Sequence, residues 1–138
     1  MKKIILLILM LAMHIFCFAQ DSVTFKGYIH NEEYKVYIKM NFYDKNVIVP
    51  GQEIFGELPG YFGSKNDSRK WLFTDAVIKN RTTAEISITN DYGSEDLTAT
   101  LKLLPDGSYE LIQNEGSTLK IVEKRKWVKI PKKIILTR

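Results

Sequence analysis

The sequence YKVYIKMNFY, residues 34–43, alternates apolar and polar side chains without a break. Successive side chains of a β-strand point to opposite faces of its sheet, so this period of two predicts a half-buried strand. Its apolar face would carry Tyr34, Val36, Ile38, Met40 and Phe42.

Residues 23–30 alternate in the same way. A short turn at Asn31-Glu32 would place Ile29 opposite Tyr34 and keep both apolar sets on one side of the sheet. We therefore expect the first two strands to form an antiparallel hairpin.

The second half of the chain predicts three further turns, at residues 91–94, 105–107 and 114–116. Each contains glycine together with Asp or Asn, the residues that favour tight turns. The apolar positions expected to face each other are 84–88 with 97–103, Leu103 with Tyr109, and Leu111 with Leu119. This pattern indicates a meander of at least four antiparallel strands.

The middle of the chain has less regular signals. Val47–Val49 and Ile54–Phe55 resemble short strand pieces, and residues 71–79 are apolar on both faces. No stretch has the apolar stripe and caps of a helix. We predict an all-β domain of eight or nine antiparallel strands, either a barrel or a sandwich. Consecutive hairpins favour an up-and-down meander, lipocalin-like in general shape.

The N-terminus has the pattern of a secretory signal peptide. Lys2-Lys3 precede an apolar run from Ile4 to Phe18 that is too short to cross a membrane comfortably. We expect cleavage after Ala19, which divides the chain into a leader at 1–19 and one domain at 20–138. A lipid anchor on Cys17 and an uncleaved membrane anchor are the disfavoured alternatives. The protein would be exported, periplasmic or extracellular, with no membrane span after cleavage.

Cleavage would leave a domain without cysteine and with His30 as its only histidine. Thiol catalysis and Cys/His zinc sites then lack candidates, and no phosphate-binding glycine pattern is present. We predict no catalytic residue, no metal ligand and no cofactor. A hydrolase that uses two carboxylates is the remaining enzymatic alternative. Its candidates are Glu53 with Glu57, and Asp91, Glu95 and Asp96 around one turn.

Positive charge gathers at the C-terminus. Residues 120–138 contain eight Lys or Arg against Glu123 alone, a net charge of +7, whereas residues 21–119 have a net charge of −5. Such a patch can attract an anionic partner. The candidate contact residues are Lys124, Arg125, Lys126, Trp127 and Lys129. The alternative is two short edge strands that lysines and Pro131 guard against edge-to-edge pairing.

The outer face of the first hairpin is a second candidate surface. It combines Lys26, Tyr28, Lys35 and Tyr37, with Tyr28 expected beside Lys35 and Lys26 beside Tyr37. Aromatic and basic side chains in alternation can stack sugars or bases, although such pairs also stabilise ordinary sheets. Nucleic acid is disfavoured as the ligand of an exported protein.

FKGYI at residues 25–29, followed by VYIKMNF at 36–42, resembles a group of small exported β-rich proteins of Gram-negative bacteria. Residues 60–62 and 88–93 follow the order of that group. The resemblance implies the build and the compartment, but no activity and no site residue.

Taken together, these patterns favour a non-enzymatic exported β-domain that binds a partner or ligand at the cell envelope. The partner is unknown; an anionic envelope component or another exported protein fits. The alternative is a carrier of a small apolar ligand inside the barrel. Its lining would be Phe25, Ile38, Met40, Phe42, Ile86 and Leu101.

Overall fold

The computed structural model describes residues 23–138, and the predicted leader with its cleavage point lies outside this range. The alternating stretch at residues 34–43 contains strand β2 (Val36–Asn41). Val36, Ile38 and Met40 are buried, as its period of two predicts.

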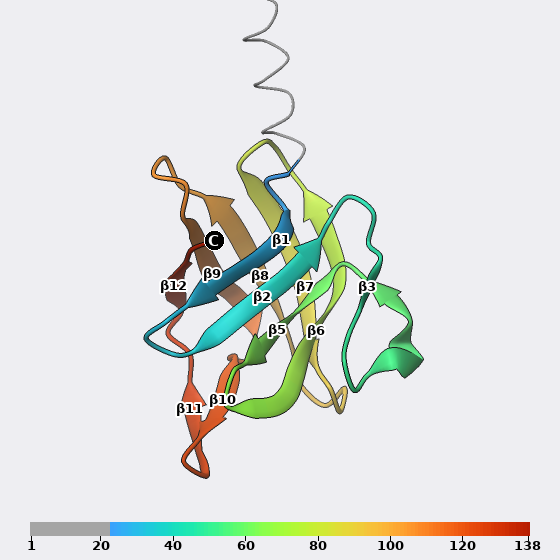
Figure 1. The fold of residues 1–138 in the computed structure, drawn as a ribbon, viewed down its shortest axis with the longest axis vertical. Helices are drawn as coiled ribbons and strands as arrows, with labels where there is room; N and C mark the ends of the chain where they lie inside the picture. Colours follow the sequence, from blue (N-terminus) through green and yellow to red (C-terminus); the bar gives the residue numbers. More distant parts are fainter. Residues whose placement is uncertain (1–22) are drawn as a thin grey trace, which may run out of the picture.

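Eight strands form one antiparallel sheet in the order β1-β2-β5-β6-β7-β8-β9-β12. They are β1 (Lys26–Asn31), β2, β5 (Gly60–Ser64), β6 (Asp67–Ile78), β7 (Thr83–Asn90), β8 (Asp96–Leu103), β9 (Tyr109–Gly116) and β12 (Lys133–Leu136). The two end strands meet where His30 and Thr137 exchange backbone hydrogen bonds, each 2.8 Å long. The sheet is thus a nearly closed barrel in meander order, which confirms the predicted all-β fold (Figure 1).

Two short hairpins stand outside this sheet. The first pairs β3 (Val47–Ile48) with β4 (Glu57–Leu58) and holds a 3₁₀ helix, η1 (Glu53–Phe55), between them. The second pairs β10 (Lys120–Glu123) with β11 (Lys126–Lys129).

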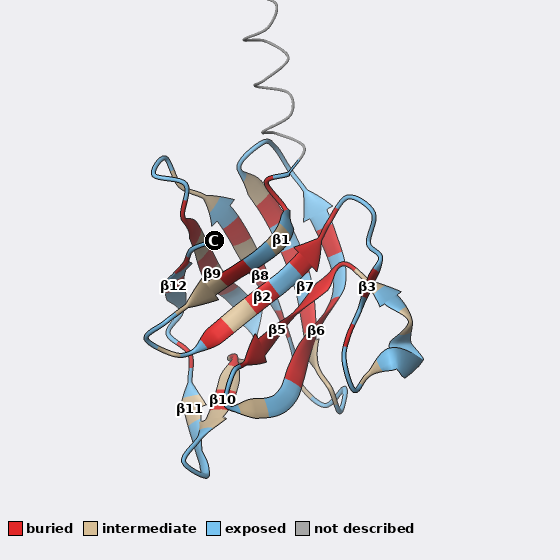
Figure 2. Ribbon diagram, viewed as in Figure 1, coloured by how far each residue is buried: buried red, intermediate tan, exposed pale blue. Residues whose placement is uncertain are grey.

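Buried apolar side chains from all eight strands and from the segments that enter them form one core cluster. Figure 2 shows the buried positions along the strands. Burial of one such side chain contributes about 1.5–3 kcal/mol. This core must hold the domain together without an intramolecular disulfide, because the chain has a single cysteine. Its largest fully buried members are Phe25, Ile29, Ile38, Phe62, Phe73, Ile86, Ile88, Leu101, Tyr109 and Leu111.

The register of the first hairpin differs from the predicted one. Ile29 pairs with Ile38 instead of Tyr34, so residues 32–35 form the turn. Asn31 stabilises this wider turn, because its side-chain oxygen accepts a hydrogen bond from the N–H of Tyr34 at 2.8 Å. The partner of Ile29 shifts along β2 by an even number of residues, so the side chains of both strands keep their predicted faces.

The hairpins β7–β8 and β8–β9 have the predicted pairing. Ile86 lies opposite Ala99, and Leu103 lies opposite Tyr109.

The predicted hairpin at residues 114–116 is wrong. Strand β9 continues through this segment and pairs Gly116 with Leu97 of β8. On its other side, Leu111 pairs with Ile134 of β12 rather than with Leu119. The strand that follows in sequence leaves the barrel as β10, and β12 takes the position beside β9.

The β3–β4 excursion explains why β6 is apolar on both faces. Trp71 and Phe73 belong to the barrel core, whereas Leu72 packs outside it with Val47 and Val49 of the excursion. The predicted strand piece at Ile54–Phe55 is wrong, because these residues form η1.

Candidate functional site

The predicted basic patch lies on one projecting hairpin, β10–β11, opposite the end of the barrel at which the described chain begins (Figure 1). The hairpin pairs Glu123 with Lys126, which leaves a loop of two residues. Its strand β11 and its loop together carry Lys124, Arg125, Lys126, Trp127 and Lys129. Of the remaining cations of the C-terminal stretch, Lys120 lies on β10, Lys133 begins β12 and Arg138 contacts the first described residues.

The loop residues of this hairpin have an unusual backbone. Lys124 and Arg125 have φ of 50° and 67°, the pattern of a type I′ turn, for which Asn-Gly is the preferred pair. A residue other than glycine costs of order 1 kcal/mol or more in this region of conformational space. The chain therefore places two cations where Asn and Gly would give a more stable turn.

Gln113 fixes the base of the hairpin to the barrel. Its Oε1 accepts a hydrogen bond from the N–H of Leu119 at 2.7 Å. Its Nε2 donates to the carbonyls of Ile130 at 3.2 Å and Pro131 at 3.0 Å. One buried amide thus holds both strands where they leave the barrel.

Two further contacts orient the hairpin. The Trp71 indole N–H donates to the Lys120 carbonyl at 3.0 Å, and Lys120 Nζ lies 2.8 Å from Glu95 Oε1. The base of the hairpin is therefore attached to the barrel through backbone, amide, indole and ion-pair contacts, and its tip projects from the barrel.

The cations at the tip are not neutralised by the protein. Within residues 23–138, Lys124, Arg125, Lys126 and Lys129 form no ion pair. All four are exposed. Their field is therefore available to an external anion.

Trp127 is 62% exposed and lies beside these cations. The Arg69 guanidinium lies 5.2 Å from the centroid of its ring, within the range of a cation–π contact. Asp67 holds Arg69 with hydrogen bonds of 3.0 and 3.1 Å. These bonds raise the pKa of Arg69, and Arg69 in turn positions the indole ring.

Sequence reasoning missed Arg69 and Tyr92 as members of this surface. Tyr92 is 81% exposed at the tip of the β7–β8 turn, and its charge adds a smaller upward contribution to the pKa of Arg69. The sequence signal that could have indicated Tyr92 is an aromatic residue inside a turn of Asp, Gly and Ser. The closeness of Tyr92 to Arg69 depends on how the strands assemble.

The second predicted surface is assembled differently from the prediction. Tyr28 pairs with Lys39 instead of Lys35, and Lys26 pairs with Asn41 instead of Tyr37. Lys35 lies in the turn with φ of 53°. The outer face of β1–β2 therefore keeps Lys26, Tyr28 and Tyr37 but replaces Lys35 with Lys39.

The tyrosines of this face pack on one another. Tyr37 stacks on Tyr28 with centroids 5.4 Å apart and meets Tyr61 edge-on at 5.8 Å. Burial, with smaller contributions from Tyr61 and Tyr28, raises the pKa of Tyr37 to about 12. A Cβ at Gly63 would lie 2.7 Å from the Tyr37 ring, so this glycine provides the space that the ring occupies. This arrangement favours a structural role for Tyr37.

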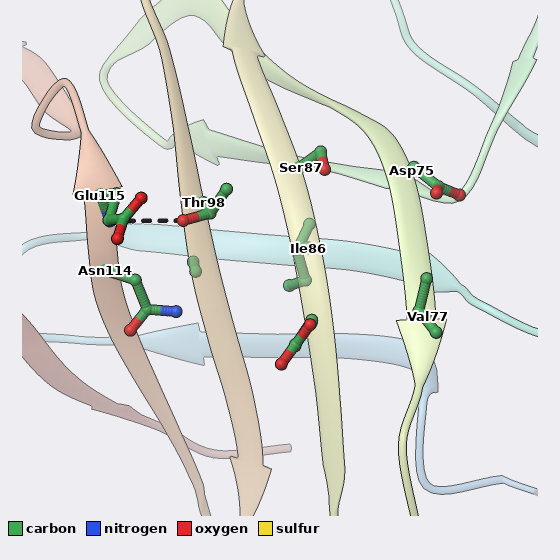
Figure 3. A pocket seen from close by; sticks show the side chains of 9 residues that line it. Asp75, Val77, Ile86, Ser87, Thr98, Asn114 and Glu115 are labelled. Carbon is green, nitrogen blue, oxygen red and sulfur yellow. Dashed lines mark hydrogen bonds between the residues drawn. The ribbon is translucent and has the colours of Figure 1, made fainter.

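An open hollow of about 320 Å³ lies on the outer face of β6–β9 (Figure 3). Asp75 and Glu115 stand at its opposite sides, with Ser87 and Thr98 between them. Because β6 and β9 are three strand spacings apart, the two carboxylates are separated by about 14 Å. That exceeds the 5–9.5 Å that a pair of glycosidase carboxylates needs.

The acids predicted for the hydrolase alternative have structural partners or lie exposed; they are Glu53, Glu57, Asp91, Glu95 and Asp96. Lys45 lowers the pKa of Asp75 through a hydrogen bond, which opposes a role as general acid. Glu95 pairs with Lys120, and Asp91 accepts a hydrogen bond from the Lys70 N–H at 3.3 Å. Among residues 23–138, no group of three or more His, Cys, Asp or Glu is placed to hold a metal ion.

His30 lies on β1 with its Nδ1 2.9 Å from Glu32 Oε1. The contact does not have hydrogen-bond geometry, and Nδ1 has no hydrogen-bond partner among residues 23–138. The ring also stacks on Tyr28 at 5.9 Å. His30 is therefore partly covered on the outer face of the barrel rather than exposed in a turn.

The six residues predicted to line a ligand cavity all belong to the packed core. Each is at most 3% exposed, and Phe25 stacks on Phe42 at 5.6 Å. Their mutual packing favours an interior filled by side chains.

No family model matches this chain, no curated protein matches its sequence, and no solved structure matches its fold. The part of the chain that the structure describes contains no helix long and apolar enough to span a membrane. The candidate site is therefore defined by its own geometry: a cationic hairpin that is anchored at its base and carries an exposed indole in contact with Arg69.

Proposed function

We propose that this protein is an exported, non-enzymatic β-domain that binds an anionic component of the cell envelope through the β10–β11 hairpin. The observation that carries the proposal is the set of four unpaired cations on a hairpin with a locked base. Unpaired like charges repel one another, and two of them also occupy an unfavourable backbone region. An external anion would relieve the repulsion.

Export is supported by the leader pattern at residues 1–19 and by the resemblance to small exported β-rich proteins. A binding role, rather than catalysis, is supported by the distance between Asp75 and Glu115 and by the ion pairs that hold Asp75 and Glu95. The periplasm or the extracellular space would then be the place of action.

A triple variant, Lys124→Asn, Arg125→Gly and Lys126→Ser, tests the proposal. It removes three cations, and it places the preferred residues in the turn so that folding is not impaired. The matched control, Lys45→Ser, Lys79→Ser and Lys102→Ser, removes the same charge from exposed positions outside both candidate surfaces.

Binding is measured at low salt with phosphatidylglycerol vesicles and with polygalacturonate. We expect the hairpin variant to lose at least tenfold in affinity for an anionic probe, and the control to lose less than threefold. Equal losses in the two variants would overturn the proposal, because net charge alone would then explain binding. Failure of the unaltered protein to bind either probe would also count against it.

A further inference from the structure

Trp127 has a place in the site that charge alone does not explain. Its ring is 62% exposed although its neighbours in the hairpin are mostly cations. Arg69 contacts it from the barrel, and Asp67 fixes Arg69 in turn. An exposed indole held in one orientation has the properties of a stacking platform.

Lys129 lies on the same face of β11 as Trp127, because the two are separated by one residue. The pairing places Lys120 opposite Lys129 and Val122 opposite Trp127. Lys120 is already neutralised by Glu95. The face therefore offers one aromatic ring and, about 7 Å along the strand, one free ammonium group.

We propose that this face is a binding site for an acidic glycan, a refinement that rests on the proposed function. The C–H groups on one side of a sugar ring would stack on Trp127, as polarised C–H edges do on aromatic faces. A carboxylate of the sugar would meet Lys129, and the next acidic groups along the chain would meet Lys124 and Arg125 of the loop.

A lipid surface fits the hairpin less well. The tip that would enter a membrane first is Lys124-Arg125, with no apolar side chain to insert. Among residues 23–138, the most exposed large apolar side chain is Ile54 at 89%, followed along the chain by the half-exposed Phe55. Both belong to η1, which lies on a different side of the barrel from β10–β11 (Figure 1).

The test compares three probes at equal salt: polygalacturonate, the neutral polysaccharide dextran, and phosphatidylglycerol vesicles. The variants are Trp127→Ala and Trp127→Phe, with Phe55→Ala as a control at an exposed ring outside both candidate surfaces. Trp127 is exposed and Trp71 is buried, so acrylamide quenching of fluorescence reports selectively on Trp127 in the unaltered protein.

We expect polygalacturonate to protect Trp127 from acrylamide and dextran to leave it accessible. Trp127→Ala should weaken polygalacturonate binding about tenfold, the order of one lost stacking contact, and Trp127→Phe should retain most of it. Binding that Trp127→Ala leaves unchanged would overturn the glycan site while the charge-based function survives. Preferential binding to vesicles, with no protection by polygalacturonate, would assign the hairpin to a lipid surface instead. Failure of the unaltered protein to bind any anionic probe would overturn both proposals.

Discussion

Arg138, the last residue of the chain, donates a hydrogen bond to the hydroxyl of Tyr109 at 2.8 Å and lies over the same ring at 5.5 Å. Its guanidinium also donates to the carbonyls of Val23 and Lys26, and Tyr109 donates to the carbonyl of Thr24. The two ends of the described chain are thereby joined beside the seam of the barrel.

Tyr109→Phe should lower the free energy of unfolding by about 1–2 kcal/mol, because it removes a buried hydroxyl donor and leaves the packing unchanged. Urea denaturation measures the difference. Tyr28→Phe, at an exposed ring, is the control and should change stability by less than about 0.5 kcal/mol. Equal effects of the two changes would contradict a role for the Tyr109 hydroxyl.

Gln113→Leu should cost about 2–3 kcal/mol of stability, since the buried N–H of Leu119 and the carbonyls of Ile130 and Pro131 would lose their partner. The hairpin should also loosen, so amide exchange should accelerate in residues 119–130 more than in β7 and β8. Asn114→Ala, one residue away and exposed, is the matched control. Uniform acceleration of exchange would argue against a local anchor.

Gly63→Ala should destabilise the fold by about 1–3 kcal/mol through overpacking, because its Cβ would enter the space of the Tyr37 ring. Tyr37→Ala removes that ring. The double variant should therefore be more stable than the sum of the two single effects predicts. Additive effects in a denaturation cycle would place the strain elsewhere.

Lys124→Asn with Arg125→Gly should raise stability by about 1 kcal/mol, because both residues tolerate positive φ. The same change should weaken binding to an anionic probe. Thermal unfolding and a binding titration of one preparation measure both. A variant that is stabilised and binds unchanged would show that the loop charges have no role.

Tyr37 should titrate near pH 12 in the folded protein, about two units later than an ordinary tyrosine. Because the folded state holds this proton more tightly, its contribution to stability is present below pH 10 and declines as pH rises from 10 toward 12. Absorbance at the tyrosinate band measures the late phase, and Tyr37→Phe should remove it. An unchanged titration of the variant would assign the phase to another residue.

Local sequence patterns predicted much of the fold. The alternation at residues 34–43 and the turn at residues 105–107 correctly predicted strands, faces and one hairpin register, because these features depend on neighbours in the sequence. The register of the first hairpin was predicted wrongly, because the same residues can form a two-residue or a four-residue turn. The prediction used the two-residue turn, whereas the Asn31 side chain caps a four-residue turn. The partner of Leu111 was missed because β12 is distant in the chain.

The sequence likewise predicted only part of the candidate site. The cations at 124–126 and the indole of Trp127 were predicted as one surface because they are consecutive residues. Arg69 and Tyr92 were not, because they reach that surface from other strands and turns. The predicted pairing of Tyr28 with Lys35 failed with the hairpin register, and Lys39 took that place.

The amino-acid sequence by itself determined the all-β class, the inward face of most strands and the concentration of positive charge near the C-terminus. These follow from side-chain alternation and composition, which need no knowledge of distant partners. Only the tertiary structure decided that β12 would return to close the barrel at His30 and that β10–β11 would leave it as a separate hairpin. It also decided that Arg69 would lie over Trp127. Those outcomes depend on contacts between residues tens of positions apart, and such contacts form only when the whole core is packed.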